Sequence, residues 1–280
     1  MKRVRRFIKN FVNVLFEPEM LILPGQLSFF FFLSVVPIIT LISYAASFLN
    51  LPIDFISTFL TNAFGKSTAE YIVPMVSGVT LSTGYIVTLL VGYFIASNGA
   101  SSMIITSNTI YGIKDAGFLR RRIKALIMTL FIVILFIFIL VIPVFGDTII
   151  DLIKFVNFNS SVTKNIELIF NILGGPLSWF IIFFFIKILY TMAPDRKIPS
   201  SYVNYGAVFT SAGWIVATIL YSNYINKFAN YDIFYGGLAN IVILMLWVYL
   251  LAYIFVIGLA LNNRREINML ERTSQIQKID

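Results

Sequence analysis

The chain has 280 residues, of which 59% are hydrophobic and 12% are charged, and its mean hydropathy is +0.88. Because an average soluble domain is about 25% charged, this composition excludes an ordinary water-soluble globule and predicts a protein embedded in a lipid bilayer. The chain contains no Cys and no His, which excludes disulfides, thiolate metal sites and His-based catalytic triads. Carboxylate-only metal sites remain open, but the 13 acidic residues form no tight cluster, and we expect no cofactor.

Six segments have the run of about 20 mostly apolar residues that a membrane-spanning helix requires. The predicted fold class is an all-α integral membrane protein, a bundle of six transmembrane helices with further amphipathic helices at the membrane surface. An amphipathic helix (1–20) precedes the membrane domain (21–263), and a basic, polar tail (264–280) follows it. The predicted spans are 27–49, 83–110, 123–145, 172–193, 205–227 and 235–261.

Lysine and arginine are distributed unequally between the two sides of these spans. Of the 21 residues, 16 fall on the side that holds both termini, 4 fall on the other side, and Lys187 lies within a span. Because basic loops remain in the cytoplasm, both termini are predicted to lie there. The basic residues then face anionic lipid headgroups, so the net charge of +8 does not require a nucleic-acid partner.

Three segments outside the spans are predicted to lie at the membrane surface. Residues 1–16 carry one apolar stripe at helical spacing, and most of their basic side chains lie elsewhere. We interpret this segment as a helix on the inner leaflet, and the alternative is a helix that binds a calmodulin-like partner. Residues 50–82 and 147–171 repeat apolar residues at the same spacing. We expect them to rest on the outer face and to cap a cavity there.

The second predicted span contains the polar stretch IASNGASSM (95–103). A loop there would leave two apolar pieces too short to cross a membrane, so the stretch is predicted to lie in the middle of one helix. Pro37 lies at similar depth in the first span, where it removes a backbone hydrogen bond. Polar groups at this depth must face protein or water, which indicates either close helix packing or a substrate site. The residues of this candidate midplane site are Ser34, Pro37, Ser97, Asn98 and Ser101.

Four side chains in the later spans also need an explanation. Lys187 lies about two turns from the cytoplasmic end of the fourth span. Its ammonium group either reaches the membrane interface or acts as a functional cation that faces the bundle. Trp247 and Tyr249 lie near the centre of the sixth span, where we expect them to pack in the core. Asn262 is expected to end that span by satisfying its terminal carbonyl groups.

Several motifs follow one another along the chain in a specific order and spacing. They are GQLSFFFFLSVVP (25–37), SNTIY (107–111), RRRIKA (120–125), APDRKIP (193–199), YGAVF (205–209) and the segment 235–263. Together they resemble the YihY/BrkB family of membrane proteins over most of the chain. The residues that match the family's later motifs are Pro194, Pro199, Gly206, Trp214, Tyr235, Gly236, Trp247, Tyr249, Gly258 and Asn262.

One position departs from the family pattern. The family commonly ends its last span with Gly-Ala-Glu-Leu-Asn, and here Ala260 takes the place of the Glu, so an ion or proton ligand at that position is lost. The resemblance implies a six-span protein of the bacterial inner membrane. The family has carried the label of a ribonuclease, and some members have been linked to virulence. Phosphodiester cleavage usually needs a metal cluster or an acid–base pair, and because neither is visible we expect no enzymatic activity.

The preferred function is that of a transporter- or flippase-like protein with an undefined substrate, which could be a small solute, an ion or a lipid. A non-transporting scaffold of the envelope that binds lipid or protein is the alternative, and a membrane enzyme is the third possibility. The low charge within the spans argues against an ion-coupled pump, because proton and sodium relays usually carry acidic residues there. A polar cavity near Asn98 would favour transport, and a solid bundle with lipid-facing grooves would favour the scaffold.

Overall fold

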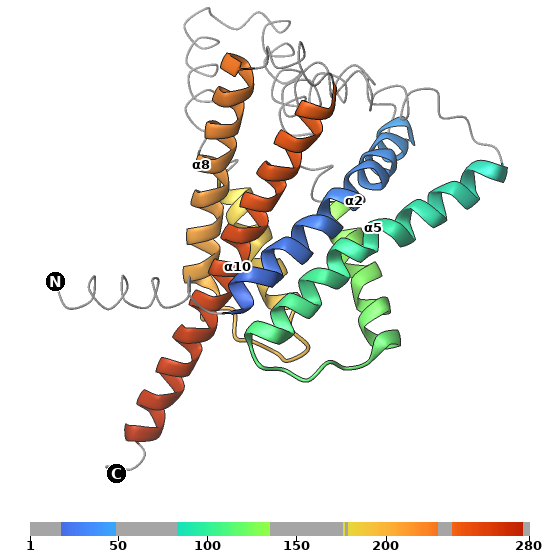
Figure 1. Cartoon of the computed structure of the whole chain (residues 1–280). Coiled ribbons are helices and arrows are strands. Elements are labelled where there is room, and N and C mark those ends of the chain that lie inside the picture. The colour runs from blue at the N-terminus through green and yellow to red at the C-terminus, as the bar shows by residue number, and fades with distance from the viewer. Residues whose placement is uncertain (1–17, 49–82, 135–175, 177–178, 229–236, 277–280) are drawn as a thin grey trace, which may run out of the picture.

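The computed structural model describes residues 18–48, 83–134, 176, 179–228 and 237–276, and within these ranges every regular element is a helix. Two shorter helices cover 118–134 and Trp179–Met192. The four longer helices are α2 (Glu19–Phe48), α5 (Thr83–Ile110), α8 (Asn204–Phe228) and α10 (Gly237–Ile276) (Figure 1). Among the described residues, three segments are long and apolar enough to cross a membrane: Glu19–Leu41, Leu89–Ile110 and Ile241–Glu271. The chain is therefore an all-α membrane protein.

The bounds of the helices can be compared with the predicted spans. α5 covers the predicted range 83–110 without interruption, and α2 continues through Pro37. α10 continues to Ile276, so the prediction that Asn262 ends this helix is wrong. The Asn262 side chain bonds to another helix instead of capping its own. The residues that follow include Arg, Glu, Met and Leu, which are good helix formers.

Parts of the prediction fall outside the described residues. The third predicted span (123–145) is described over 123–134, and the fourth (172–193) is described at 176 and over 179–193. The predicted surface segments 50–82 and 147–171 lie outside the description entirely, and so does the surface helix 1–20 apart from its last residues, where α2 begins. Tyr235 and Gly236 also lie outside it.

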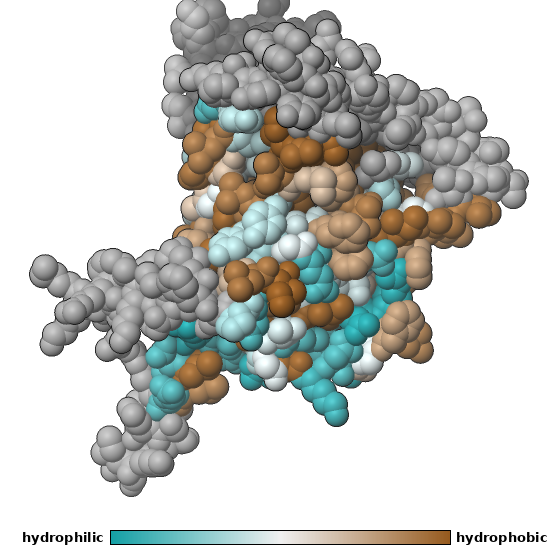
Figure 2. All heavy atoms as spheres, in the orientation of Figure 1, coloured by the Kyte–Doolittle hydropathy of each residue, from teal (hydrophilic) through white to brown (hydrophobic). Residues whose placement is uncertain are grey.

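The helices form two pairs. α2 packs along α5, and α10 packs against both α8 and α2. The two pairs lie close together at one end and diverge toward the other (Figure 1). We call the close end the basic end, because the links 111–117 and 193–203 meet there and carry lysine and arginine. Figure 2 shows hydrophilic side chains gathered at this end and hydrophobic side chains on the surface above it.

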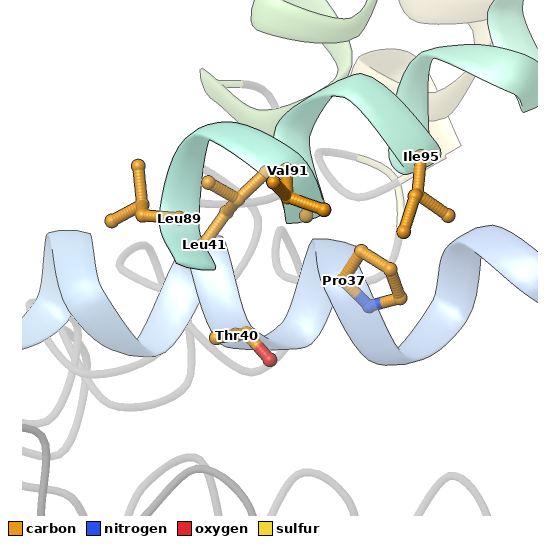
Figure 3. Close-up of a pocket in the computed structure, with 7 residues that line it drawn as sticks. Pro37, Thr40, Leu41, Leu89, Val91 and Ile95 are labelled. Atoms are coloured by element: carbon orange, nitrogen blue, oxygen red, sulfur yellow. The ribbon is translucent and has the colours of Figure 1, made fainter. Parts of the chain in front are cut away.

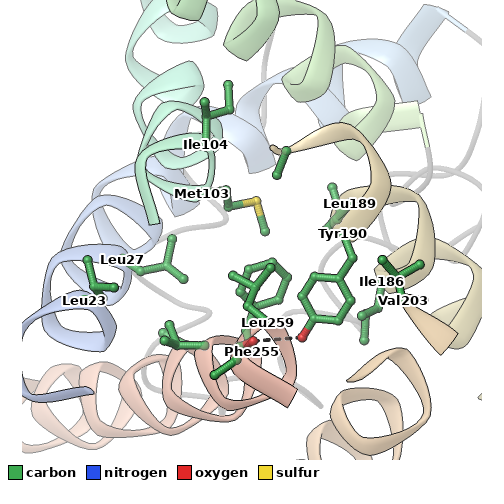
Figure 4. Packing of buried hydrophobic residues seen from close by; sticks show 14 of the residues in the cluster. Leu23, Leu27, Met103, Ile104, Ile186, Leu189, Tyr190, Val203, Phe255 and Leu259 are labelled. Carbon is green, nitrogen blue, oxygen red and sulfur yellow. Dashed lines mark hydrogen bonds between the residues drawn. The ribbon is translucent and has the colours of Figure 1, made fainter. Parts of the chain in front are cut away.

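The buried core lies near the basic end, where α2, α5, Trp179–Met192 and α10 contribute side chains to one cluster. On the outside of the bundle, by contrast, Leu220 and Leu246 are each 62% exposed, as expected of side chains that contact lipid. The core residues labelled in Figure 4 are Leu23, Leu27, Met103, Ile104, Ile186, Leu189, Tyr190, Val203, Phe255 and Leu259.

The end of α5 is set by a glycine turn. Gly112 has φ of 62°, a conformation that glycine adopts at little cost. The amide of Ile113 donates to the carbonyl of Asn108 at 2.8 Å, and the amide of Gly112 donates to that of Thr109 at 3.1 Å. This is the Schellman pattern of helix termination. It satisfies the terminal carbonyl groups of α5 and directs the chain into the link 111–117.

Candidate functional site

The polar stretch of α5 packs against α2 at a point of close approach. The Ser34 hydroxyl lies 2.7 Å from the carbonyl oxygen of Phe30, in its own helix, and 3.0 Å from that of Ala96 in α5. A Cβ atom added to Gly99 would lie 3.0 Å from the Ser34 oxygen, so the absence of a side chain at Gly99 allows the two helices to approach this closely. Ser34 and the stretch 95–103, both predicted from sequence, are therefore in contact.

Asn98 and Ser97 are hydrogen-bonded within the bundle. The Arg122 guanidinium, from the helix 118–134, donates to Asn98 Oδ1 and to the carbonyl oxygen of Phe94, each at 2.8 Å. It also lies 3.5 Å from the centre of the Phe94 ring, a cation–π contact. The Ser97 hydroxyl donates to the same Phe94 carbonyl at 2.7 Å. The polar stretch is thus tied to a basic residue that the sequence analysis placed in the link between spans.

Pro37 lines an apolar groove between α2 and α5 with a volume of about 210 Å³. Pro37, Thr40 and Leu41 line it from α2, and Leu89, Val91 and Ile95 line it from α5 (Figure 3). Gly92 forms part of the same wall and leaves room there, because a Cβ atom added to it would lie 3.9 Å from Pro37 Cβ. Val91 and Ile95 are also exposed, so the groove opens onto the apolar surface of the bundle.

The groove and the polar cluster are neighbours on α5. Ile95, which lines the groove, and Asn98 are three residues apart and therefore adjacent on the helix surface. Further along α5, the hydroxyls of Ser102, Thr106 and Ser107 are buried and have no hydrogen-bond partner within the described part of the chain. Ser101 is half-buried. The arrangement joins an apolar groove to a guanidinium–amide pair, which fits a ligand that is apolar at one end and anionic at the other.

At the basic end, Asp195 joins three segments of the chain. Its carboxylate accepts hydrogen bonds from Asn108 Nδ2 and from Lys124 Nζ, each at 2.8 Å. The amide of Asp195 donates to Asn108 Oδ1 at 2.8 Å, so that the two residues bond to each other twice. Lys124 Nζ also donates to the carbonyl oxygens of Ala193 and Pro194. The motifs SNTIY and APDRKIP therefore meet through Asn108 and Asp195.

The electrostatics of this cluster favour the charged carboxylate. Burial alone would raise the pKa of Asp195, but hydrogen bonds from Lys124 and Asn108 and the charge of Lys124 outweigh it, so the pKa lies below its ordinary value. The Asp195 side chain is 5% exposed. Asp195 is therefore a charged, buried link between the helices rather than a free acid.

Two asparagines of α10 bond to the ends of neighbouring helices. Asn262 Oδ1 accepts a hydrogen bond from the amide of Gly206 in the first turn of α8, at 2.7 Å. Asn263 Nδ2 donates to the carbonyl oxygen of Ile110 at the end of α5, also at 2.7 Å. Because the first amides and last carbonyls of a helix have no partner within it, these side chains satisfy groups that would otherwise be unpaired.

An ion pair adds a further contact between these segments. Arg196 donates to the buried carboxylate of Glu266 in α10 at 2.8 Å. Burial, and then the negative charge of Glu266, raise the pKa of the nearby Tyr111 well above its ordinary range, so the hydroxyl stays protonated. With the Asp195 cluster and the two α10 asparagines, this ion pair holds α5, α8, α10 and the link 193–203 together.

α8 and α10 are in close contact at two glycines that belong to the family motifs. A Cβ atom added to Gly206 would lie 2.2 Å from the carbonyl oxygen of Gly258, and one added to Gly258 would lie 2.2 Å from the Thr210 and Tyr190 oxygens. The Tyr190 hydroxyl hydrogen-bonds to Thr210 at 2.6 Å and donates to the carbonyl of Phe255 at 2.8 Å. Only glycine fits at these two positions.

The other family-motif residues within the described ranges contact neighbouring helices, links or side chains. Trp214 Nε1 donates to the carbonyl oxygen of Leu251 at 3.0 Å, which links α8 to α10. Trp247 is half-buried and stacks on Tyr221. Tyr249 lies beside Tyr253 on the same helix and is 39% exposed, so the prediction that it packs in the core is wrong. The carbonyl groups of Pro194 and Pro199 accept hydrogen bonds from Lys124 Nζ and from the amide of Tyr202.

Lys187 lies apart from both clusters. In the helix Trp179–Met192, the side chains of Phe185, Ile186, Leu189 and Tyr190 are buried in the core. Lys187 lies on the other side, where it lines a groove with the exposed Phe184 and Ile188. It therefore points away from the buried core.

Several residues of these clusters were not predicted to belong to a site: Asn108, Arg122, Lys124, Asp195, Arg196, Asn263 and Glu266. The sequence does contain one signal, because Asp195 is an acidic residue directly beside a span end rich in Lys and Arg. The basic partners of the two buried carboxylates, however, are distant in the sequence. Lys124 lies 71 residues from Asp195, and Arg196 lies 70 residues from Glu266.

The fold and the clusters define a class of protein. Apolar helices with lipid-exposed outer surfaces and internally bonded polar groups are characteristic of integral membrane proteins. Within the described ranges, no group of three acidic side chains lies close enough together to hold a metal ion.

The chain belongs to the Virulence factor BrkB family, whose model matches residues 18–278. It is 27% identical over 243 residues to the ribonuclease-like protein YfkH of Bacillus subtilis, an alignment that covers 85% of this chain and 87% of YfkH. It is 37% identical over 79 residues to a UPF0761 membrane protein of Idiomarina loihiensis, which covers 28% of each chain. A UPF0761 membrane protein of Pseudomonas aeruginosa is 29% identical over 92 residues, or 33% of this chain and 22% of that protein. No solved structure matches.

Proposed function

We propose that this protein is a flippase-like transporter of lipid in the bacterial inner membrane, with six spans and both termini in the cytoplasm. The observation that supports it is the position of the Arg122–Asn98 pair one helical turn from the apolar groove at Pro37. A phospholipid has the same division, with an anionic phosphate beside apolar chains. The distribution of Lys and Arg along the sequence supports the orientation.

The proposed mechanism uses the two parts of the site together. Acyl chains lie along the groove between α2 and α5, which opens onto the exposed surface at Val91 and Ile95. Arg122 binds the phosphate through charge-assisted hydrogen bonds. Two of its five N–H groups donate to Asn98 and Phe94, and among the donors that remain is the buried Nε–H, which has no partner within the described part of the chain. Asn98 positions the guanidinium.

This proposal is tested by lipid movement in reconstituted liposomes. Dithionite destroys the fluorescence of NBD-labelled phospholipid in the outer leaflet, and lipid that crosses the bilayer is destroyed later at the rate of its movement. We expect wild-type protein to speed this second phase, and Asn98→Leu and Arg122→Met to slow it. The matched control is Asn268→Leu, at an exposed asparagine whose side chain donates to the carbonyl oxygen of Arg264 in its own helix. Wild-type rates in both site variants would contradict the proposal.

A non-transporting scaffold is the alternative function. The hydrogen bonds that join α5, α8, α10 and the link 193–203 at the basic end favour a static bundle, and the groove at Pro37 could then hold a permanently bound lipid. A correctly inserted wild-type protein that moves neither lipid, solutes nor ions would support this alternative.

We also propose that the protein is not an enzyme, although the Bacillus relative has a ribonuclease-like name. The chain lacks His and Cys. Asp115, Asp195 and Glu266 each form an ion pair with a basic residue, which leaves these carboxylates unsuited to act as a general base. Incubation of the purified protein with labelled RNA tests this directly, and we expect no cleavage above that of a mock purification.

A further inference from the structure

A second groove lies at the basic end of the helix Trp179–Met192, on the side away from the core. It has a volume of about 330 Å³. Phe184, Lys187, Ile188, Thr191, Met192 and Ser200 line it, the first five from the helix and Ser200 from the link 193–203. The groove therefore combines one cation and two hydroxyls with apolar walls.

The walls of the groove belong to the outer, apolar surface of the helix. Phe180, Phe184 and Ile188 are all exposed and form one stripe at helical spacing. Lys187 is next to this stripe, five residues before the end of the helix, or about 7 to 8 Å along its axis. A lysine side chain at this depth reaches the level of the lipid headgroups while its methylene groups stay among the acyl chains.

The polar groups in the groove favour an anion. The ion pairs described between side chains join Arg121 to Asp115, Lys124 to Asp195 and Arg196 to Glu266, and within the described residues none includes Lys187. The Thr191 hydroxyl donates to the carbonyl oxygen of Lys187 at 2.8 Å, so its hydrogen is used within the helix. The donors that remain in the groove are the Lys187 ammonium and the Ser200 hydroxyl.

We propose that this groove binds the head group of an anionic phospholipid from the leaflet at the basic end. Lys187 Nζ and the Ser200 hydroxyl bind the phosphate, and Phe184, Ile188 and Met192 contact the first carbons of the acyl chains. A free inorganic anion would leave these apolar walls without a partner, which is why the lipid is the favoured occupant. The site is separate from the groove at Pro37 and does not depend on lipid transport.

The proposal is tested by titrating phosphatidylglycerol and phosphatidylcholine into purified full-length protein in a neutral detergent and counting bound lipids by native mass spectrometry. We expect phosphatidylglycerol to bind more tightly. Lys187→Met should weaken this binding about fivefold, the effect of one lysine near a charged lipid surface. Lys187→Arg should retain it, and Ser200→Ala should lose about twofold, because one hydrogen bond is removed.

The matched control is Lys197→Met, which removes an exposed lysine from the same link without touching the groove. We expect it to bind phosphatidylglycerol as the wild type does. Equal losses in Lys187→Met and Lys197→Met would overturn the proposal, because they would indicate a general attraction of the basic end for anions. Complete displacement of the lipid by millimolar inorganic phosphate would overturn it as well, and so would unchanged binding in folded Lys187→Met.

Discussion

Replacing Gly206 by alanine tests the close contact between α8 and α10. The added Cβ atom would lie 2.2 Å from the carbonyl oxygen of Gly258 and 2.4 Å from Asn262 Nδ2. Carbon–oxygen contacts of this kind settle at about 3.3 to 3.6 Å, so the methyl group is too close by roughly 1 Å. Because the nearest atom is backbone, the two helices must separate to make room.

The cost of this separation has two parts. Forcing a methyl group into a packed interface costs about 1 to 3 kcal/mol. Moving α8 away from α10 also stretches the 2.7 Å hydrogen bond from the Gly206 amide to Asn262, whose loss costs about 0.5 to 1.5 kcal/mol. We therefore expect Gly206→Ala to lower the free energy of unfolding by about 2 to 4 kcal/mol, measured by SDS titration in mixed micelles.

The control is Gly25→Ala in α2, where an added Cβ atom would meet nothing within 4 Å. Alanine has the higher helix propensity, so this variant should be as stable as the wild type or more stable. If Gly206→Ala unfolds at the same SDS fraction as Gly25→Ala, the close approach of α8 and α10 is not a feature of the folded protein.

Three further predictions concern the polar links. Asp195→Asn should lower the stability of the protein by an amount that is constant above pH 3.8, the ordinary pKa of Asp. Below this pH the difference from the wild type should shrink, because wild-type Asp195 becomes protonated as the pH falls through its lowered pKa. Thermal unfolding at a series of pH values measures this difference. Asn262→Ala should speed hydrogen exchange at the Gly206 amide and cost about 1 kcal/mol, as loss of an N-cap does, and unaltered exchange there would exclude the bond. A double-mutant cycle of Arg122→Gln and Asn98→Leu should give a coupling of about 1 to 2 kcal/mol, whereas additive effects would mean that the side chains do not interact.

The sequence predicted the membrane class and the course of the polar stretch through α5, because both depend on local hydrophobicity and on length. α5 is helical across residues 95–103, as the length argument requires. The contact of Ser34 with this stretch could also be predicted, since Pro37, close to Ser34 in the same helix, and the stretch were expected to lie at similar depth. These inferences need only the rise of a helix and the thickness of a bilayer.

The hydrogen bonds between distant segments could not be predicted in the same way. Asn108 and Asp195 are 87 positions apart, and Asn263 and Ile110 are 153 positions apart. Which polar residues meet depends on how the helices are arranged around one another, and hydrophobic periodicity does not specify this. Asn262 is an example, because its place in the sequence predicts a role within its own helix, whereas in the structure it bonds to the start of α8.

The contact between Asn98 and Arg122 could not be predicted for a related reason. The third predicted span begins at residue 123, which leaves Arg122 outside the predicted spans, whereas Asn98 lies in the middle of the second one. In the structure, Arg122 belongs to the helix 118–134 and its guanidinium contacts Asn98 and the Phe94 ring. A long basic side chain beside an apolar helix can extend toward a polar partner, so its Cα position does not define the depth of its charge.

In the proposed mechanism, the groove between α2 and α5 takes the acyl chains of a lipid that crosses the membrane. Gly92→Leu tests it most directly, because the backbone has room for a Cβ atom at this position and the larger side chain would fill the groove beside Pro37. In the liposome assay, we predict that Gly92→Leu moves labelled phospholipid much more slowly than the matched variant Gly25→Leu, while both proteins remain folded. Equal rates in the two variants, or a wild-type rate no faster than that of protein-free liposomes, would contradict the account.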